Sequence, residues 1–145
     1  MNHRLRTAIV GAIIAAPLAL GAAGARAQVS TTGYFQAQTG EGVYTSLCQG
    51  CHMADAKGAA GAGAYPALAG NVRLASGAYP AMLVLQGHKA MPPFGGNLTD
   101  DQIAAVVNYV RTHFGNAYKD PVTPAAVKAL RDAGAKRSGK ATSAG

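Results

Sequence analysis

The sequence predicts a small all-α domain of three to five short helices. No segment alternates apolar and polar residues with the period of a strand, whereas several segments repeat apolar residues at helical spacing. Bulky apolar residues are scarce: after residue 27, only 20 of 118 positions hold Ile, Leu, Val or Phe, about 17%. Such an inventory is thin for one domain, so we expect the helices to wrap around a cofactor that completes the core.

Residues 1–27 have the order of an export signal. Two arginines precede an apolar run over 8–23, and Ala25-Arg26-Ala27 places small residues where a signal peptidase reads. The alternative is a retained membrane anchor, which the Gly and Ala content and an internal proline disfavour. We therefore expect cleavage before Gln28, with an N-terminal extension over 28–39 in the exported chain.

The helices have recognisable start signals. Thr39 can cap a first helix that runs through Glu41 to Cys51. A later helix begins after Leu98, where Thr99 and Gln102 form a capping box and apolar residues then recur at helical spacing through about Phe114. Between these helices, 57–64 is a Gly/Ala loop, 65–71 continues it, and 79–85 is a short apolar helix.

The C-terminal part is where the basic charge lies. Residues 28–127 hold five residues of each sign, so the body is formally neutral, and the excess comes from 128–140. We expect a C-terminal extension over 116–134, with a short helix from Ala125 to Ala133 after Thr123-Pro124, and a disordered basic tail over 135–145. This segment lacks the area and the aromatic residues of a nucleic-acid surface, which excludes nucleic acid as a partner.

The chemistry is predicted by Cys48-Gln49-Gly50-Cys51-His52, which contains both cysteines of the sequence. One helical turn places two thiols three residues apart on one face, where both can bond the vinyl-derived carbons of a porphyrin while His52 reaches the iron. A disulfide or a thioredoxin-type dithiol is the alternative, but a redox dithiol should follow a strand. A tetrahedral zinc site lacks a second pair of ligands. The pattern therefore predicts one covalently attached haem c.

Met91 is the candidate for the second axial ligand. It begins Met91-Pro92-Pro93-Phe94, in which two prolines stiffen the loop that presents the thioether. Met82 is a rival within the apolar helix, where a role in the core is favoured, and Met53 is too close to His52 to reach the opposite face. His88 would give a two-histidine iron, and His113 stands near a helix end.

Over roughly 40–114 these motifs resemble the class I c-type cytochromes, small helical carriers with one haem. The resemblance rests on Gly40 with Tyr44, CQGCH, Pro66-x-Leu68, and MPPF followed by LTDDQIAAVVNYVR. It implies the class I cytochrome c fold for a domain over 40–115 and places Tyr44 in the haem environment.

The same resemblance implies specific contacts. The Pro66 carbonyl is expected to accept a hydrogen bond from Nδ1 of His52, and Leu68 to touch the haem. Gly40 and Tyr44 are expected to cross the later helix near Val106 and Tyr109.

The segment from Met91 to Asn116 is similar to haem domains that serve periplasmic alcohol, sugar-acid and aldehyde dehydrogenases. This similarity implies a periplasmic location and redox proteins as partners. Those relatives often carry several haems in one chain, whereas this sequence has a single CxxCH. The chain is then expected to be a monomer or a subunit of a complex.

The predicted function is one-electron transfer, without catalysis of its own, from a dehydrogenase or quinol-oxidising complex toward a terminal oxidase. Methionine ligation and an apolar pocket raise the reduction potential, which suits this place in a chain of carriers. A fixed electron-accepting subunit of a dehydrogenase is the alternative. A haem enzyme or gas sensor with an open iron site is a third possibility, which a stable Met91 ligand disfavours.

Overall fold

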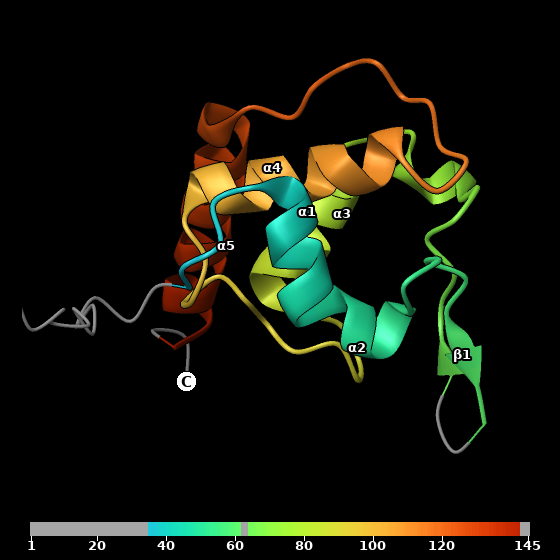
Figure 1. Ribbon diagram of the computed structural model, residues 1–145. Helices are drawn as coiled ribbons and strands as arrows, with labels where there is room; N and C mark the ends of the chain where they lie inside the picture. The colour runs from blue at the N-terminus through green and yellow to red at the C-terminus, as the bar shows by residue number, and fades with distance from the viewer. Residues whose placement is uncertain (1–34, 62–63, 143–145) are drawn as a thin grey trace, which may run out of the picture. The chain divides into compact units, whose positions relative to one another are not determined.

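The computed structural model describes residues 35–61 and 64–142, so the expected export signal over 1–27 lies outside the described residues. The described part is mostly helical, and Figure 1 shows the arrangement of its elements. In chain order these are α1 Gly40–Val43, the π-helix η1 Tyr44–Cys48, α2 Gln49–His52, β1 Ala59–Ala60, β2 Ala64–Tyr65, the 3₁₀-helix η2 Val72–Leu74, α3 Ala78–Gln86, α4 Asp100–Thr112 and α5 Pro124–Thr142. None of the described helices is long and apolar enough to cross a membrane.

The first three helical elements follow one another without a break and cross α4. Thr39 caps α1 as predicted, because its side chain accepts a hydrogen bond from the Gly42 N–H. Gly40 lies directly against α4: a Cβ there would meet the Ala105 carbonyl and come within 2.7 Å of the Tyr109 Cβ. The predicted close crossing of these helices is confirmed, and only glycine permits it.

Helix α4 is the central element of the core. The predicted capping box is present, with reciprocal hydrogen bonds between Thr99 and Gln102. The buried Gln102 amide also donates to the carbonyls of Phe35 and Ala37, which fixes the chain that leads into α1. Helix α4 supplies five of the thirteen buried hydrophobic residues in the described part of the chain, more than any other element there. The thirteen are Val43, Tyr44, Ala56, Leu74, Ala81, Leu85, Leu98, Ile103, Ala104, Val106, Val107, Val110 and Val127.

The segment 113–123 has no regular secondary structure, but it is tied to the core by side chains of α4. Asn108 exchanges two hydrogen bonds with the backbone of Val122. The fully buried Arg111 donates to the carbonyls of Leu74 and Ala75, and it pairs with Asp120, whose carboxylate lies 2.7 Å from Nη2. We call 113–123 the strap. It returns the chain along the core to the start of α5.

Two expectations from the sequence are wrong. The Gly/Ala loop contains a short antiparallel strand pair in which Ala59 pairs with Tyr65 and Ala60 with Ala64. At two residues a strand, the pair is too short for alternation to reveal it.

The C-terminal helix also runs further than predicted. Instead of ending near Gly134, with disorder from Ala135, α5 continues to Thr142. Gly134 and Gly139 each cost the helix about 1 kcal/mol, whereas the Ala, Lys and Arg residues around them are good helix formers. A 2.7 Å ion pair between Lys128 and Asp132, one turn apart, supports the same helix.

Candidate functional site

The CxxCH motif lies on the helical segment that crosses α4. Cys48 ends the π-helical turn of η1 and is half-buried, whereas Cys51 in α2 is exposed. Both thiols are free. Burial, with a smaller contribution from Cys51, raises the pKa of the Cys48 thiol to about 11. A thiol of this kind is protonated at neutral pH, unlike the low-pKa nucleophile of a thiol oxidoreductase.

The imidazole of His52 is held by a hydrogen-bonding contact with a residue 14 positions further along the chain. Its Nδ1 lies 3.0 Å from the carbonyl oxygen of Pro66, the contact that the resemblance implied. Because a carbonyl can only accept, Nδ1 carries a proton, and in the neutral imidazole the lone pair is then on Nε2. This is the arrangement by which second-shell groups fix the tautomer and ring orientation of a metal-binding histidine.

Gly58 allows the backbone after His52 to pass close to Pro66. No sequence pattern indicates a role for this glycine. Its N–H donates to the His52 carbonyl at 3.1 Å, and its φ of +70° belongs to the left-handed region. A Cβ at this position would meet the Tyr65 carbonyl and lie 2.8 Å from the Pro66 carbonyl carbon. Gly58 therefore lets the chain after His52 fold back beside Pro66.

The segment that follows Pro66 is anchored from two sides. The N–H groups of Leu68 and Ala69 both donate to the carbonyl of the buried Ala56, at 2.7 and 2.9 Å. From the strap, the Asn116 amide donates to the Leu68 carbonyl at 2.9 Å. No local pattern could reveal Asn116, because its partner lies 48 residues away.

Met91 is presented by a tight turn. Its backbone N–H and carbonyl each pair with His88 at 2.9 Å, forming an isolated antiparallel bridge. Gly87 adopts a φ of +71°, and a Cβ there would come within 2.6 Å of the Met91 carbonyl oxygen. Gly87 therefore restrains the loop on the N-terminal side of Met91, and Pro92 and Pro93 restrain it on the C-terminal side. The sequence predicts only the restraint by the prolines.

The other candidate ligands have distinct environments. Met82 is half-buried within α3, and His88 is exposed at the turn that it forms with Met91. His113 stacks on Tyr109 with ring centroids 4.2 Å apart, and its Nδ1 lies 2.8 Å from the Tyr109 carbonyl oxygen. It therefore belongs to the end of α4.

Tyr44 lies inside the crossing of the first helical segment with α4. Its ring packs against Tyr109 and Phe114, at centroid distances of 5.8 and 5.0 Å, and its hydroxyl donates to the Met53 carbonyl at 2.7 Å. Burial is the largest cause that raises the pKa of the Tyr44 hydroxyl to about 12. The hydrogen bond fixes the backbone immediately after His52, where Met53 has a φ of +66°.

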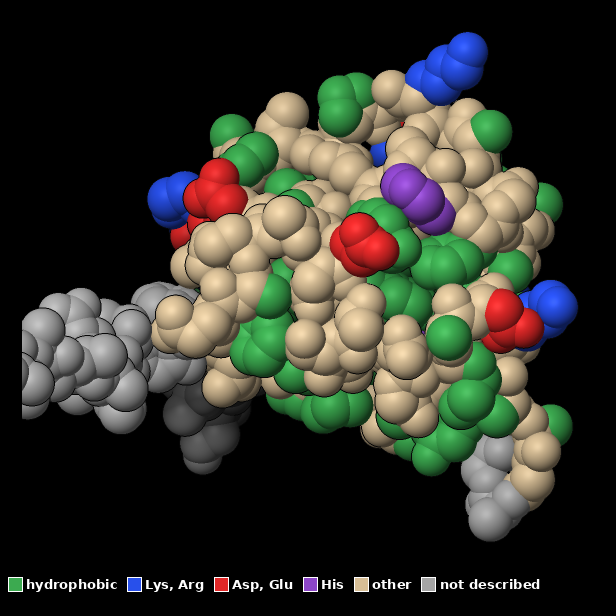
Figure 2. All heavy atoms as spheres, in the orientation of Figure 1, with side chains coloured by type: hydrophobic (Ala, Val, Ile, Leu, Met, Phe, Trp, Pro, Cys, Tyr) green, Lys and Arg blue, Asp and Glu red, His purple; other side chains and the backbone are tan. Residues whose placement is uncertain are grey.

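These residues fit a haem bound through two thioethers. Two unbridged thiols and an imidazole with its Nδ1 engaged lie on one helical segment. Leu68, Val84 and Phe94 pack against the core but are only partly buried, so part of their apolar surface is left uncovered. Figure 2 shows groups of hydrophobic side chains at the surface of the face drawn there. Within the described residues, no three His, Cys, Asp or Glu side chains gather as a protein-only metal site would require.

The fold and this donor set define a c-type cytochrome, an electron-transfer protein whose cofactor is haem c. The chain belongs to the family described as cytochrome c oxidase, cbb3-type, subunit III, whose model matches residues 35–110.

The chain is similar to curated proteins that are named as cytochrome subunits of dehydrogenases. The chain is 34% identical over 133 residues to a fructose dehydrogenase cytochrome subunit of Gluconobacter japonicus, covering 81% of this chain and 27% of that protein. It is 35% identical to a gluconate 2-dehydrogenase cytochrome c subunit of Pantoea cypripedii, over 65% of this chain and 24% of the relative. It is 36% identical to the cytochrome c subunit of a quinone alcohol dehydrogenase of Gluconacetobacter polyoxogenes, over 66% of this chain and 23% of the relative.

The chain spans about a quarter of the length of these relatives. No solved structure gives a significant match.

Proposed function

We propose that this chain is a periplasmic one-electron carrier with one haem c attached covalently to Cys48 and Cys51 and ligated by His52 and Met91. It passes electrons from a dehydrogenase or quinol-oxidising complex toward a terminal oxidase. The observation that carries the proposal is the 3.0 Å contact between His52 Nδ1 and the Pro66 carbonyl, directly after two free thiols. That contact prepares Nε2 for an iron beside the attachment sites.

The protein residues supply ligands and orientation. When bound, the haem supplies a one-electron couple, and no bond to a substrate is made or broken. The Pro66 carbonyl keeps the His52 proton on Nδ1. The turn at His88 and Met91 holds a thioether in a fixed place, and a thioether ligand favours the ferrous form and raises the reduction potential. Leu68 and Phe94 offer apolar surface to the porphyrin.

A fixed electron-accepting subunit is the second candidate function. The similar curated proteins are named as cytochrome subunits of fructose, gluconate and alcohol dehydrogenases, which supports a place within such a complex. Size-exclusion chromatography of a periplasmic extract distinguishes the two, because a shuttle elutes alone whereas a subunit elutes with dehydrogenase activity.

Covalent attachment is tested on the purified protein. After extraction with acid and acetone, the colour should remain with the polypeptide, and its intact mass should exceed that of the chain starting at Gln28 by one haem. The Cys48→Ala, Cys51→Ala double variant should lose the pigment, and Met82→Leu is the matched control that should keep it. Pigment that passes into the solvent from the unaltered protein would overturn the proposal.

Export is tested on the same sample. An N-terminus at Gln28 in the periplasmic fraction supports cleavage of the signal over 1–27, whereas an intact N-terminus in the membrane fraction supports an anchor.

A further inference from the structure

The loop that carries Met91 spans 87–99, between α3 and α4, and a residue of α5 contacts the part of it that follows Met91. We propose that Arg131 is a positioning residue for Met91: it fixes the end of the loop and thereby opposes displacement of the methionine from the iron. This inference rests on the proposed function. It concerns a helix that lies entirely beyond residues 35–110, the part of the chain that matches the family.

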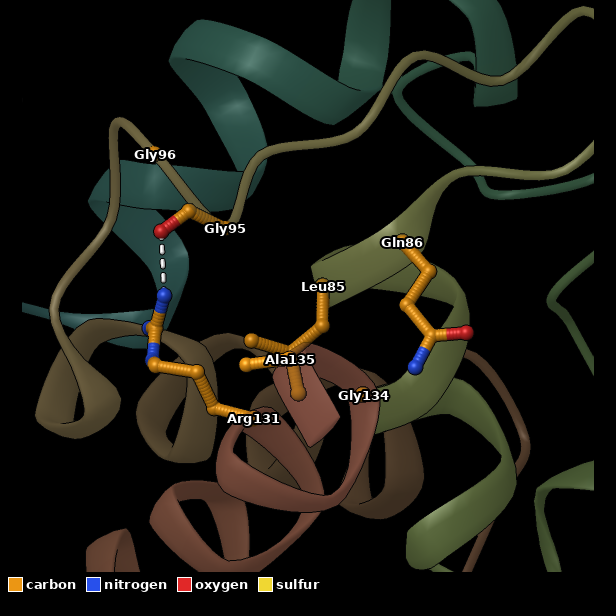
Figure 3. A pocket seen from close by; sticks show the side chains of 7 residues that line it. All are labelled: Leu85, Gln86, Gly95, Gly96, Arg131, Gly134 and Ala135. Carbon is orange, nitrogen blue, oxygen red and sulfur yellow. Dashed lines mark hydrogen bonds between the residues drawn. The ribbon is translucent and has the colours of Figure 1, made fainter. Parts of the chain in front are cut away.

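Arg131 bonds with all three of its guanidinium nitrogens, two to the loop and one to the first residue of α4. Nη1 donates to the Gly95 carbonyl, Nη2 donates to the Leu98 carbonyl at 3.1 Å, and Nε donates to the Asp100 carboxylate at 2.8 Å. Figure 3 shows the side chain extending from α5 to the Gly95 carbonyl. A rigid planar fork that bonds two carbonyls and a carboxylate fixes both position and orientation, and a lysine could not reproduce it.

The same stretch is bonded to α3 on its other side. The N–H of Phe94 donates to the Val84 carbonyl at 2.8 Å, and that of Gly95 donates to the Leu85 carbonyl at 3.2 Å. A Cβ at Gly95 would lie 2.7 Å from the Leu85 carbonyl oxygen, so the loop is pressed against α3 at this point. Gly95 is therefore bonded on one side to Arg131 of α5 and on the other side to Leu85 of α3.

Only three residues separate Met91 from this anchor, and two of them are Pro92 and Pro93. Because proline fixes φ, this short connection transmits a displacement of Gly95 to Met91 instead of absorbing it. At the other end, the pairing with His88 restrains the turn. Loss of the Arg131 contacts leaves this end of the loop held by α3 alone, which makes a loop conformation with Met91 off the iron easier to reach.

A cavity beside Arg131 suggests an anion site as an alternative role. It is lined by Leu85, Gln86, Gly95, Gly96, Gly134 and Ala135 in addition to Arg131 (Figure 3). These residues add no second cation, and every guanidinium nitrogen already has a partner within the protein. The contacts therefore favour the role in holding the loop.

The helix that supplies Arg131 is firmly placed. Val127 on α5 is fully buried, and Leu130 packs against the core, so the arginine projects from a docked helix. Its side chain is 31% exposed. Lys128, on the same helix, forms its ion pair with Asp132 and feels Asp100 and Arg131 through charge alone, which makes it the matched control for loss of one positive charge without loss of the guanidinium hydrogen bonds.

The test measures how readily imidazole displaces Met91 from the ferric holoprotein. Arg131→Ala should lower the imidazole concentration at half-saturation by roughly tenfold, which corresponds to about 1.4 kcal/mol. Arg131→Lys, which keeps the charge but loses the fork, should shift it in the same direction and guards against a failure of the Ala variant to fold. Lys128→Gln should leave it unchanged.

The measurement separates positioning from general stability. A residue that only stabilises the fold supports the methionine-bound and imidazole-bound forms equally, so its loss lowers the melting temperature without changing imidazole affinity. Unchanged imidazole affinity in both Arg131 variants would overturn this inference alone, provided that the weak long-wavelength band that reports sulfur bound to ferric iron is intact. A chain that binds no haem would overturn the proposed function and this inference together.

Discussion

At the scale of single residues, Met91 and Met82 differ in how the backbone presents them. Met91 is held in a turn paired with His88, whereas Met82 lies within a regular helix. We expect Met91→Ala to abolish the weak sulfur-to-iron band of the ferric form, admit exogenous ligands and lower the reduction potential. Absorption spectra and redox titration measure these changes.

Met82→Leu is the control, because it preserves volume in α3 and should alter neither the band nor the potential. A band that survives in Met91→Ala and disappears in Met82→Leu would show that the ligand has been assigned to the wrong methionine.

Asp120 predicts a pH dependence. The hydrogen bond from Arg111 is the largest cause that lowers the pKa of the Asp120 carboxyl below its ordinary value of 3.8. A carboxyl with a lowered folded pKa contributes stability above its unfolded pKa, and this contribution is lost as the pH falls through the folded pKa. Asp120→Asn should therefore be less stable than the unaltered protein at pH 7, and the difference should shrink below about pH 4.

Urea unfolding at several pH values measures this difference. Equal stability of the two proteins at pH 7 would show that the pairing between Arg111 and Asp120 contributes nothing to folding.

At the scale of helices, the crossing of α1 with α4 depends on Gly40. A methyl group there would meet the backbone of Ala105 and the Cβ of Tyr109, neither of which can move aside without separating the helices. We expect Gly40→Ala to destabilise the protein by about 1–3 kcal/mol, the range for overpacking. Thermal unfolding of the holoprotein measures it.

Gly96→Ala is the matched control, because no atom lies within 4 Å of the added Cβ and its φ is not positive. We expect it to be neutral or slightly stabilising. Equal melting temperatures for the two variants would mean that the helices separate at little cost.

The elements that sequence reasoning predicts well are those whose signals are local. The start of α4 is an example, because Thr99 and Gln102 bond each other within one turn. The predicted end of α5 is wrong because it treats Gly134 as a stop signal. The Ala, Lys and Arg residues after Gly134 favour continuation of the helix. Periodicity could not find the strand pair at Ala59, since two residues are too few to alternate.

The residues of the candidate site likewise fall into those that a local motif predicts and those that only the fold reveals. CxxCH is a contiguous motif, and the contact between His52 and Pro66 followed from the resemblance of the surrounding segments. Gly58 and Asn116 could not be inferred, because their importance depends on which distant backbone lies beside them.

At the scale of the whole molecule, the basic charge is concentrated on α5. Residues 28–127 are formally neutral, and the charged side chains on the face in Figure 2 are few and dispersed. Steering toward an acidic redox partner then depends largely on α5. Truncation after Gly134 removes Lys136, Arg137 and Lys140 but keeps Arg131. We expect unchanged spectra and slower association at low salt.

Stopped-flow association with the native partner across a salt series measures this effect, which should vanish at high ionic strength because salt screens exposed charges. Identical association rates for the full and truncated chains at low salt would show that the C-terminal end of α5 does not steer the protein toward its partner.

The buried Arg111 has a consequence for where this domain can be divided. The family match stops at residue 110. The positive charge of the next residue, Arg111, is paired with the carboxylate of Asp120, which belongs to the strap. A segment cut after Gly115 would keep the positive charge in its interior and lose the carboxylate that neutralises it. The smallest portable haem module in this chain therefore includes the strap, so a natural or engineered fusion to another protein should place its junction after Asp120, beyond the point where the recognisable family sequence ends.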